Sequence, residues 1–293
     1  NQSIIDNTNI LNNQNIDRIA LKNINQADVF LSLSQTGLNT GKEMKKSNKI
    51  YICDRNSAHI LVQQEILSNE YRLLNLPEFK INQWFIDREL KEYEESDIIL
   101  VPSSFAKKSF EKFYTKKVKV INFPNYQRFH PVQKVKKDQK FFDILFIGSL
   151  SIRKGLHYLI EAFHKFNHPN KRLHIVGRHT ENKGFFNQKL MHDKIFIHGF
   201  VDNLKMREII NNCDVCVLPS LEDGFGMTPL QAMSCGCPVI VSENTGSADI
   251  IRENKCGFIV PIRNSEVIAD KLTLLADNKQ LLNELKYNAY KAA

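Results

Sequence analysis

The feature that constrains the fold most is a repeated pattern that begins near residue 141. Short apolar runs alternate there with amphipathic stretches of helical length, which is typical of βαβ units on a parallel sheet. Strands are predicted at 142–148, 173–177, 194–199, 214–219, 238–242 and 257–261, with candidate helices between them and after the last. Six strands with matching helices predict a complete doubly wound α/β domain.

The first half of the chain gives a weaker α/β pattern. Strands are predicted at 28–34, 48–55, 96–103 and 118–124, and helices at about 58–71 and 86–95. A chain of 293 residues is too long for one ordinary core and suits two domains of roughly 150 residues. We therefore expect a partial N-terminal Rossmann-like domain at 1–133, a charged linker at 134–140 and a second Rossmann-like domain at 141–293, facing each other across a cleft.

Cysteine usage and hydropathy exclude several classes of protein. Six Cys are too few for a disulfide scaffold, so a reducing cytoplasm is predicted. The pairs Cys213/Cys216 and Cys235/Cys237 lie in apolar stretches, which favours buried, reduced core thiols. No His or Cys cluster has zinc-ligand spacing, so no metal site is predicted. No apolar run approaches the roughly 20 residues of a membrane helix.

Charge is concentrated in one segment. The net charge is +8, and residues 107–140 alone hold 11 basic and two acidic residues. The basic segment 107–119 has two interpretations. In the first, its aromatic and lysine side chains form an amphipathic face that contacts anionic lipid peripherally at the inner face of the membrane. In the second, the aromatics pack inward and the lysines are solvated. The aromatic residues concerned are Phe105, Phe110, Phe113 and Tyr114. Nucleic-acid binding is disfavoured because no stacking module accompanies the charge.

The most informative segment is PSLEDGFGMTPLQAMSCGCPVIVS, residues 219–242. An apolar strand ends at Pro219, and the following loop brings Glu222 and Asp223 to the carboxyl edge of the sheet. Gly224 and Gly226 allow backbone N–H groups to approach a ligand closely. In open α/β sheets this edge is where ligands bind.

A helix is predicted to follow that loop. Thr228 is the expected N-cap and Pro229 the first helical residue. The N-terminus of such a helix is a site for anions, because unpaired N–H groups and the positive end of the helix dipole point at it.

These residues carry a family resemblance. The segment resembles the donor-binding signature of the retaining nucleotide-sugar glycosyltransferases of family 4, which have the GT-B architecture. Further matches are LFIGSLSIRKGLHYLIEAF (145–163), KIFIHGFVD (194–202), DRNSAH (54–59) and ESDIILVPSSF (95–105). The resemblance covers roughly residues 28–290 with its motifs in the correct order. The Gly-rich first strand-loop and the C-terminal return helix of that family are not found, so we expect an incomplete first domain or a fragment.

The resemblance assigns roles to two positions seven residues apart, Asp223 and Gln231. In the family both are acidic, the first contacting sugar hydroxyls and the second the ribose hydroxyls of the nucleotide. A neutral amide at Gln231 predicts nucleotide binding weakened by roughly tenfold, since charged hydrogen bonds contribute about 1.5–3 kcal/mol against about 0.5–1.5 for neutral ones. Alternatively, Gln231 closes a capping box with Thr228, and Glu222 takes over part of the acidic role.

The resemblance also implies a basic pair and a histidine. Arg153 and Lys154, at a strand-to-helix turn, match the pair that family members aim at the donor diphosphate, where negative charge grows as the glycosidic bond breaks. His59 matches a histidine of the first domain that faces the cleft and bonds the transferred sugar; the alternative is a structural histidine.

The remaining candidates line the donor subsite through their backbone. Phe200 and Val201 are predicted to flank the nucleobase. The residues predicted to line the phosphate and sugar subsite are Ser220, Glu222, Gly224, Phe225, Gly226, Met227 and Thr228.

The resemblance implies a metal-independent, retaining hexosyltransferase that needs no cofactor. It would move a sugar from a UDP- or GDP-sugar to the hydroxyl of a glycan or lipid-linked acceptor, in glycan, glycolipid or cell-envelope polysaccharide biosynthesis. The alternative is a catalytically impaired relative that binds nucleotide sugars or carbohydrate, or partners an active enzyme. A dehydrogenase is disfavoured because no strand is followed by GxGxxG.

Overall fold

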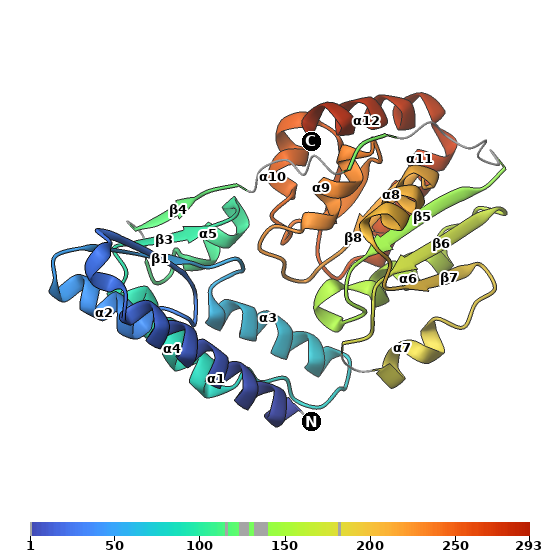
Figure 1. The fold of residues 1–293 in the computed structure, drawn as a ribbon. Helices are drawn as coiled ribbons and strands as arrows, with labels where there is room; N and C mark the ends of the chain where they lie inside the picture. The colour runs from blue at the N-terminus through green and yellow to red at the C-terminus, as the bar shows by residue number, and fades with distance from the viewer. Residues whose placement is uncertain (1, 115–116, 123–128, 132–139, 181–182) are drawn as a thin grey trace. The chain divides into compact units, whose positions relative to one another are not determined.

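The computed structural model describes residues 2–114, 117–122, 129–131, 140–180 and 183–293. The chain divides into two compact units, Asn1–Asn122 and Phe123–Ala293, each built on a parallel sheet (Figure 1). The predicted α/β fold class is confirmed. The predicted linker lies outside the described residues except for Lys140.

Unit 1 holds a four-stranded sheet in the order β1-β2-β3-β4. Its strands are β1 (Val29–Leu33), β2 (Ile50–Asp54), β3 (Ile98–Val101) and β4 (Val118–Val120), all paired in parallel. Its helices are α1 (Gln2–Leu21), the 3₁₀ turn η1 (Ile24–Gln26), α2 (Leu38–Lys46), α3 (Ile60–Leu73), α4 (Gln83–Glu95) and α5 (Ser104–Phe110). The four predicted strands and two predicted helices are confirmed, whereas α1, α2 and α5 were not expected.

Helix α1 is held by one buried acidic residue. Asp17 is fully buried and accepts hydrogen bonds from the backbone N–H groups of Asn39 and Thr40, at 2.8 and 2.9 Å, in the first turn of α2. It also pairs with Arg88 of α4 at 2.5 Å. A carboxylate at a helix N-terminus compensates unpaired N–H groups and the helix dipole. Tertiary contacts of this kind, rather than local propensity, explain why so polar a segment is helical.

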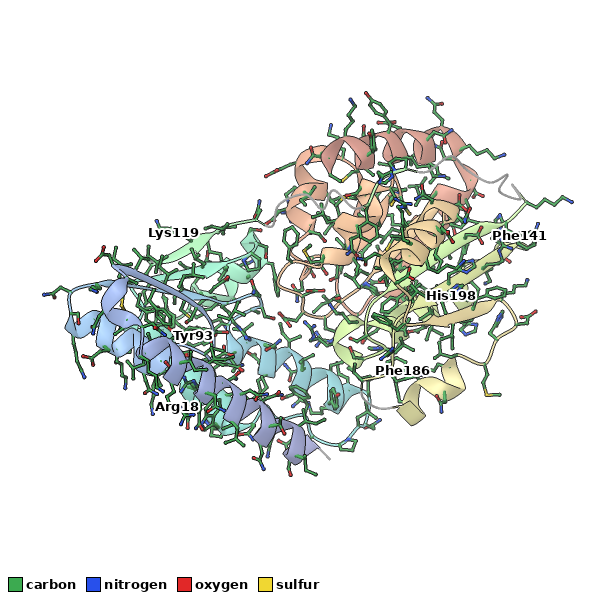
Figure 2. The ribbon with its side chains drawn as sticks, viewed as in Figure 1. Arg18, Tyr93, Lys119, Phe141, Phe186 and His198 are labelled. Atoms are coloured by element: carbon green, nitrogen blue, oxygen red, sulfur yellow. The ribbon has the colours of Figure 1, made fainter. Side chains whose placement is uncertain are left out.

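The core of unit 1 is aromatic where α3, α4 and α5 meet. Tyr93 and Phe110 are fully buried, with ring centroids 5.1 Å apart, and Tyr93 lies inside the unit in Figure 2. Phe110 comes from the basic segment, and Tyr114 packs against the same core. Phe113 is 45% exposed. Two aromatics of this segment thus pack inward, as the second interpretation predicts, and membrane contact stays a prediction that rests on Phe113 and the lysines; residues 115 and 116 lie outside the described part.

Unit 2 holds a six-stranded parallel sheet in the order β10-β9-β8-β5-β6-β7. All six predicted strands are confirmed: β5 (Phe142–Ile147), β6 (Lys171–Val176), β7 (Ile195–Gly199), β8 (Val215–Leu218), β9 (Val239–Ser242) and β10 (Gly257–Val260). Its helices are the 3₁₀ turn η2 (Ile152–Lys154), α6 (Leu156–Lys165), α7 (Lys183–Lys189), α8 (Asn203–Asn212), α9 (Met227–Ser234), α10 (Ala248–Asn254), α11 (Ser265–Asp277) and α12 (Lys279–Ala292).

The central strands β5, β8 and β9 are buried throughout, as expected for parallel strands covered on both faces. Helix α6 packs against α11, and α9 packs against α12. Across the described ranges of both units, no helix is long and apolar enough to cross a membrane.

Candidate functional site

The strand order of unit 2 indicates where a ligand site is expected. The chain runs from β5 to β6 and β7 on one side, and then returns to β8 on the other side of β5. Ligands of open α/β sheets bind outside the carboxyl ends of the strands at such a switch point. The loops that leave the two strands there are residues 148–155 and 219–226, and they contain the predicted basic pair and the predicted donor loop.

The two loops are joined by two ion pairs. Lys154 Nζ lies 2.5 Å from Oδ2 of Asp223, and Arg153 Nη1 lies 3.2 Å from Oε2 of Glu222. Glu222 is fully buried, whereas a third of the Arg153 side chain is exposed. The structure therefore brings the predicted cations and acids together, and Glu222 serves to position Arg153.

Gly155 is required for this contact. It has a φ of +66°, in the left-handed region, and follows directly after the basic pair. A Cβ built at Gly155 would lie 1.9 Å from the carbonyl oxygen of Pro219. Because no larger residue fits, the close approach of the two loops depends on this glycine.

The donor loop is also fixed from its other side, by the turn after β9. Asp223 N–H donates to the carbonyl of Asn244 at 2.9 Å, and Ser247 N–H donates to the carbonyl of Phe225 at 2.6 Å. The Asn244 amide donates to the carbonyl of Leu221 at 2.9 Å. This supporting turn was not predicted, although its position after a predicted strand end was the available signal.

The predicted start of the following helix is wrong. Helix α9 begins at Met227, and its N-cap is Gly226 in a left-handed conformation with φ 75°, without a side-chain cap. Thr228 is therefore the second helical residue and Pro229 the third. Glycine adopts the left-handed turn into the helix at low cost, and proline is tolerated anywhere in a first turn because its missing N–H has no intrahelical partner there.

This shift removes the predicted capping box. Because Thr228 is not the N-cap, Gln231 cannot close a capping box with it. The buried Oε1 of Gln231 has no hydrogen-bond partner within the described part of the chain. The hydroxyls of Ser220 and Ser247 are likewise buried without partners among the described residues. Unpaired buried polar atoms are uncommon, and such groups beside a loop and a helix N-terminus are suited to bonding a polar ligand.

The other predicted donor residues lie in the same loop or in the first turn of α9. Gly224, Phe225 and Gly226 are buried, whereas Met227 and Thr228 are half-buried. The side chain of Phe225 is only 3% exposed, so it belongs to the core and can serve a ligand only through its backbone.

A pocket of about 300 Å³ lies at the carboxyl ends of β5, β6 and β7. Its lining is mainly apolar and includes Phe200 and Val201, the residues predicted to flank a nucleobase. Gly148 forms part of its wall, and a Cβ built there would lie 3.8 Å from Cγ of Lys154. The pocket is therefore next to the ion-paired loops. Arg178 also lines the pocket and was not among the predicted residues.

His59 belongs to the interior of unit 1. It is fully buried, stacks on Phe113 with ring centroids 4.1 Å apart, and its Nδ1 accepts from the N–H of Leu61 at the start of α3. Burial, helped by the charge of Arg55, lowers the pKa of His59 to about 4. These contacts favour the structural alternative for this histidine.

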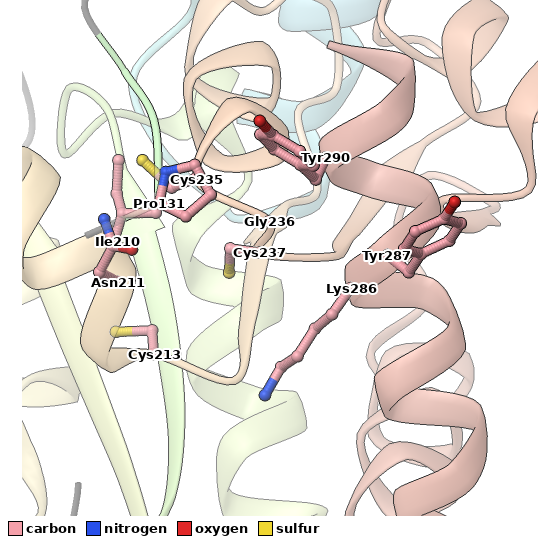
Figure 3. Close-up of a pocket in the computed structure, with 10 residues that line it drawn as sticks. All are labelled: Pro131, Ile210, Asn211, Cys213, Cys235, Gly236, Cys237, Lys286, Tyr287 and Tyr290. Carbon is pink, nitrogen blue, oxygen red and sulfur yellow. The ribbon is translucent and has the colours of Figure 1, made fainter. Parts of the chain in front are cut away.

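A second cavity, of about 290 Å³, lies at the amino ends of β8 and β9 and is shown in Figure 3. Cys213, Cys235 and Cys237 line it together with Tyr287 and Tyr290. All six cysteines are buried and free, as predicted. Burial raises the pKa of Cys235 to about 11, so its thiol is protonated at neutral pH. Among the described residues, no group of three His, Cys, Asp or Glu side chains could hold a metal ion.

The fold and the site define an α/β chain in which two ion-paired loops and a mainly apolar pocket lie at a switch point of a parallel sheet. Comparison with known proteins names the class: residues 128–292 match the family model of the glycosyl transferases group 1. The chain belongs to this family.

The names of sequence relatives agree with this assignment. An uncharacterised glycosyltransferase of Methanocaldococcus jannaschii is 34% identical over 140 residues, which is 46% of this chain and 35% of that protein. The capsular polysaccharide biosynthesis glycosyltransferase CapM of Staphylococcus aureus is 24% identical over 242 residues, 75% of this chain and 62% of the relative. The chain thus spans about a third to three fifths of the length of these relatives.

Two solved structures share the fold, and the two parallel sheets of this chain match their GT-B architecture. Sucrose-phosphate synthase from Thermosynechococcus elongatus aligns with a TM-score of 0.74 at 18% identity, over 91% of this chain and 69% of that one. HepE of Anabaena in complex with UDP aligns with a TM-score of 0.72 at 16% identity, over 94% of this chain and 76% of that one.

Proposed function

We propose that this protein is a retaining glycosyltransferase that uses a nucleoside diphosphate sugar. The observation that carries the proposal is the pairing of Arg153 and Lys154 with the donor loop at the switch point, beside an apolar pocket. The pocket takes the nucleobase, and the cations with the first N–H groups of α9 hold the diphosphate. Glycosyltransferase names among the relatives, including one of capsular polysaccharide biosynthesis, support a role in making envelope glycans.

The chemistry follows from where charge develops. The bond between the anomeric carbon and the diphosphate oxygen breaks, and an acceptor hydroxyl oxygen bonds that carbon on the same face of the sugar. The proton of the hydroxyl passes to the departing diphosphate oxygen. Arg153 and Lys154 stabilise the growing negative charge more in the transition state than in the ground state, so we propose that no metal ion is needed.

The acidic side chains have two separate tasks in this scheme. Asp223 holds Lys154 and bonds sugar hydroxyls, whereas buried Glu222 orients Arg153. The unpaired Oε1 of Gln231 bonds the ribose diol. We assign His59 no catalytic role, because the aromatic core of unit 1 encloses it.

A panel assay tests the proposal. The full chain is incubated with UDP- and GDP-sugars, and sugar release or transfer is followed together with binding. We expect binding or turnover of at least one donor, and transfer products that keep the anomeric configuration of the donor by NMR. If no donor binds at millimolar concentration and none is turned over, the proposal is wrong.

The neutral Gln231 favours a second candidate, a catalytically impaired relative that binds nucleotide sugars. The variant Gln231→Glu distinguishes the two. An active enzyme with a working amide should change nucleotide affinity by roughly tenfold or less. A rise in turnover from undetectable to measurable would identify the natural chain as the impaired form.

A further inference from the structure

The pocket beside the ion-paired loops contains one charged side chain among the described residues that line it, Arg178. Arg178 follows β6 by two residues, and its backbone is fixed because its carbonyl accepts from the N–H of Leu150 at 2.9 Å. The other polar lining side chains are the hydroxyls of Ser149 and Thr180. Ser149 already contacts the hydroxyl of Ser151 at 3.1 Å.

The guanidinium of Arg178 is held over an aromatic ring. Its Cζ lies 4.6 Å from the ring centroid of Phe200, which follows β7 and is 70% exposed. Stacking on a ring face restrains a guanidinium while leaving its edge of N–H groups available. Phe200 and Arg178 thus form the rim of the pocket, and the ring restrains the orientation of the guanidinium. The remaining walls of the pocket are mostly apolar side chains or backbone.

A guanidinium donates hydrogen bonds and cannot accept them. Guanine presents two acceptors side by side, O6 and N7, which match the two parallel N–H groups of arginine. Adenine replaces O6 with an amino donor, which opposes another donor. On the corresponding edge, uracil offers only O4, beside its C5–H group. A forked donor at the rim therefore discriminates in favour of guanine.

We propose that Arg178 is a specificity-determining residue that selects a guanine nucleotide in this pocket. The inference rests on the proposed function, since it assumes that the pocket receives the base of the donor. It deepens that function by naming the donor as a GDP-sugar.

Calorimetric titration of the full chain with GDP, UDP and ADP tests the proposal. We expect GDP to bind about tenfold more tightly than ADP or UDP. Arg178→Met, which keeps an apolar side chain on Phe200, should weaken GDP by about tenfold and ADP by less than about twofold. Arg178→Lys keeps the charge without the planar fork, so it should also lose the preference. Arg252→Met is the matched control, because Arg252 pairs with Asp249 on α10 and does not line the pocket.

Contrary results distinguish failure of the guanine preference from failure of the proposed function. Tightest binding of UDP by the natural chain would exclude a preference for guanine. Equal weakening of all three nucleotides in Arg178→Met, with recovery in Arg178→Lys, would show that Arg178 acts only on the diphosphate charge. Either result would overturn the inference alone. Absence of binding by all three nucleotides in the natural chain would overturn both the inference and the proposed function.

Discussion

The two units are stabilised in different ways. In unit 2 the central strands are buried on both faces, and two ion pairs lie in the loops at their carboxyl ends, whereas Asp143 and Arg172 form a third pair near the amino ends of β5 and β6. In unit 1 the edge strand β1 exposes about half of Val29, Leu31 and Leu33, and buried charges join the helices instead. Unit 2 therefore places two of its ion pairs where a ligand can reach them, whereas the buried charges of unit 1 hold its own elements together.

The largest expected effect concerns the buried charges that join the helices of unit 1. Asp17→Asn removes the charge that faces Arg88 and the N-terminus of α2, and we expect the free energy of unfolding to fall by about 3–4 kcal/mol. Denaturant titration of the full chain measures it. Glu43→Gln is the control, because Glu43 forms an exposed pair with Lys46. A loss below about 1 kcal/mol for Asp17→Asn would mean that α1 is held by other contacts.

Gly155 tests the contact between the two loops of unit 2. Gly155→Ala forces a Cβ against the Pro219 carbonyl in a left-handed conformation, so we expect a loss of about 3 kcal/mol in unfolding free energy. Gly184→Ala is the matched control, since a Cβ at Gly184 would meet nothing within 4 Å. Equal stability of the two variants would show that the loops can separate without cost.

Substitution of Lys154 tests whether the ion-paired loops of unit 2 act on a bound donor. Lys154→Met should lower kcat/KM for the donor by about a hundredfold, because it removes charge stabilisation from the leaving diphosphate. Lys154→Arg should recover part of the loss. Lys165→Met, at an exposed surface pair with Glu266, should leave the rate unchanged. Undiminished activity of Lys154→Met in steady-state kinetics would remove the cation from the mechanism.

The pH dependence of unit 1 should hide two opposing contributions. Burial lowers the pKa of His59 from 6.5 to about 4, so its contribution to stability is present above pH 6.5 and is lost as the pH falls toward 4. Burial raises the pKa of Glu92 from 4.5 to about 7, so its contribution is present below pH 4.5 and is lost as the pH rises through 7. Between pH 4.5 and 6.5 the two slopes oppose each other.

Two variants separate these slopes. His59→Asn keeps a good N-cap for α3 without titrating, so its stability should fall as the pH rises from 4.5 to 6.5, by about 1–2 kcal/mol relative to the natural chain. Glu92→Gln should show the opposite trend. Unfolding titrations across this pH range measure both, and parallel curves for all three proteins would exclude the assignment.

Much of the fold was predictable because its signals are local. The strands of unit 2 are short apolar runs, and the basic pair and the donor loop follow two of them, so the carboxyl-edge rule brought them together correctly. Helix α1 was not predictable, because long-range contacts, above all those of the Asp17 carboxylate, hold a polar segment. The start of α9 was misplaced because Thr228 and Pro229 imitate a cap, whereas the backbone turn of Gly226 decides it.

The candidate site was predictable in its loops but not on its rim. Arg178 carries no motif, and only the approach of β6 and β7 places it on Phe200. The burial of His59 also depends on aromatics from α4, from α5 and from the turn after α5, which are all far from His59 in sequence.

Gly177 limits how the base pocket can change in evolution. It lines the pocket, and a Cβ there would lie 1.8 Å from the carbonyl oxygen of Gly148. This part of the wall is main chain pressed against main chain, so no substitution can reshape it while the strand ends stay in place. A lineage that altered its preferred ligand would have to do so through exposed rim positions such as Arg178 and Phe200, where replacement leaves the sheet intact.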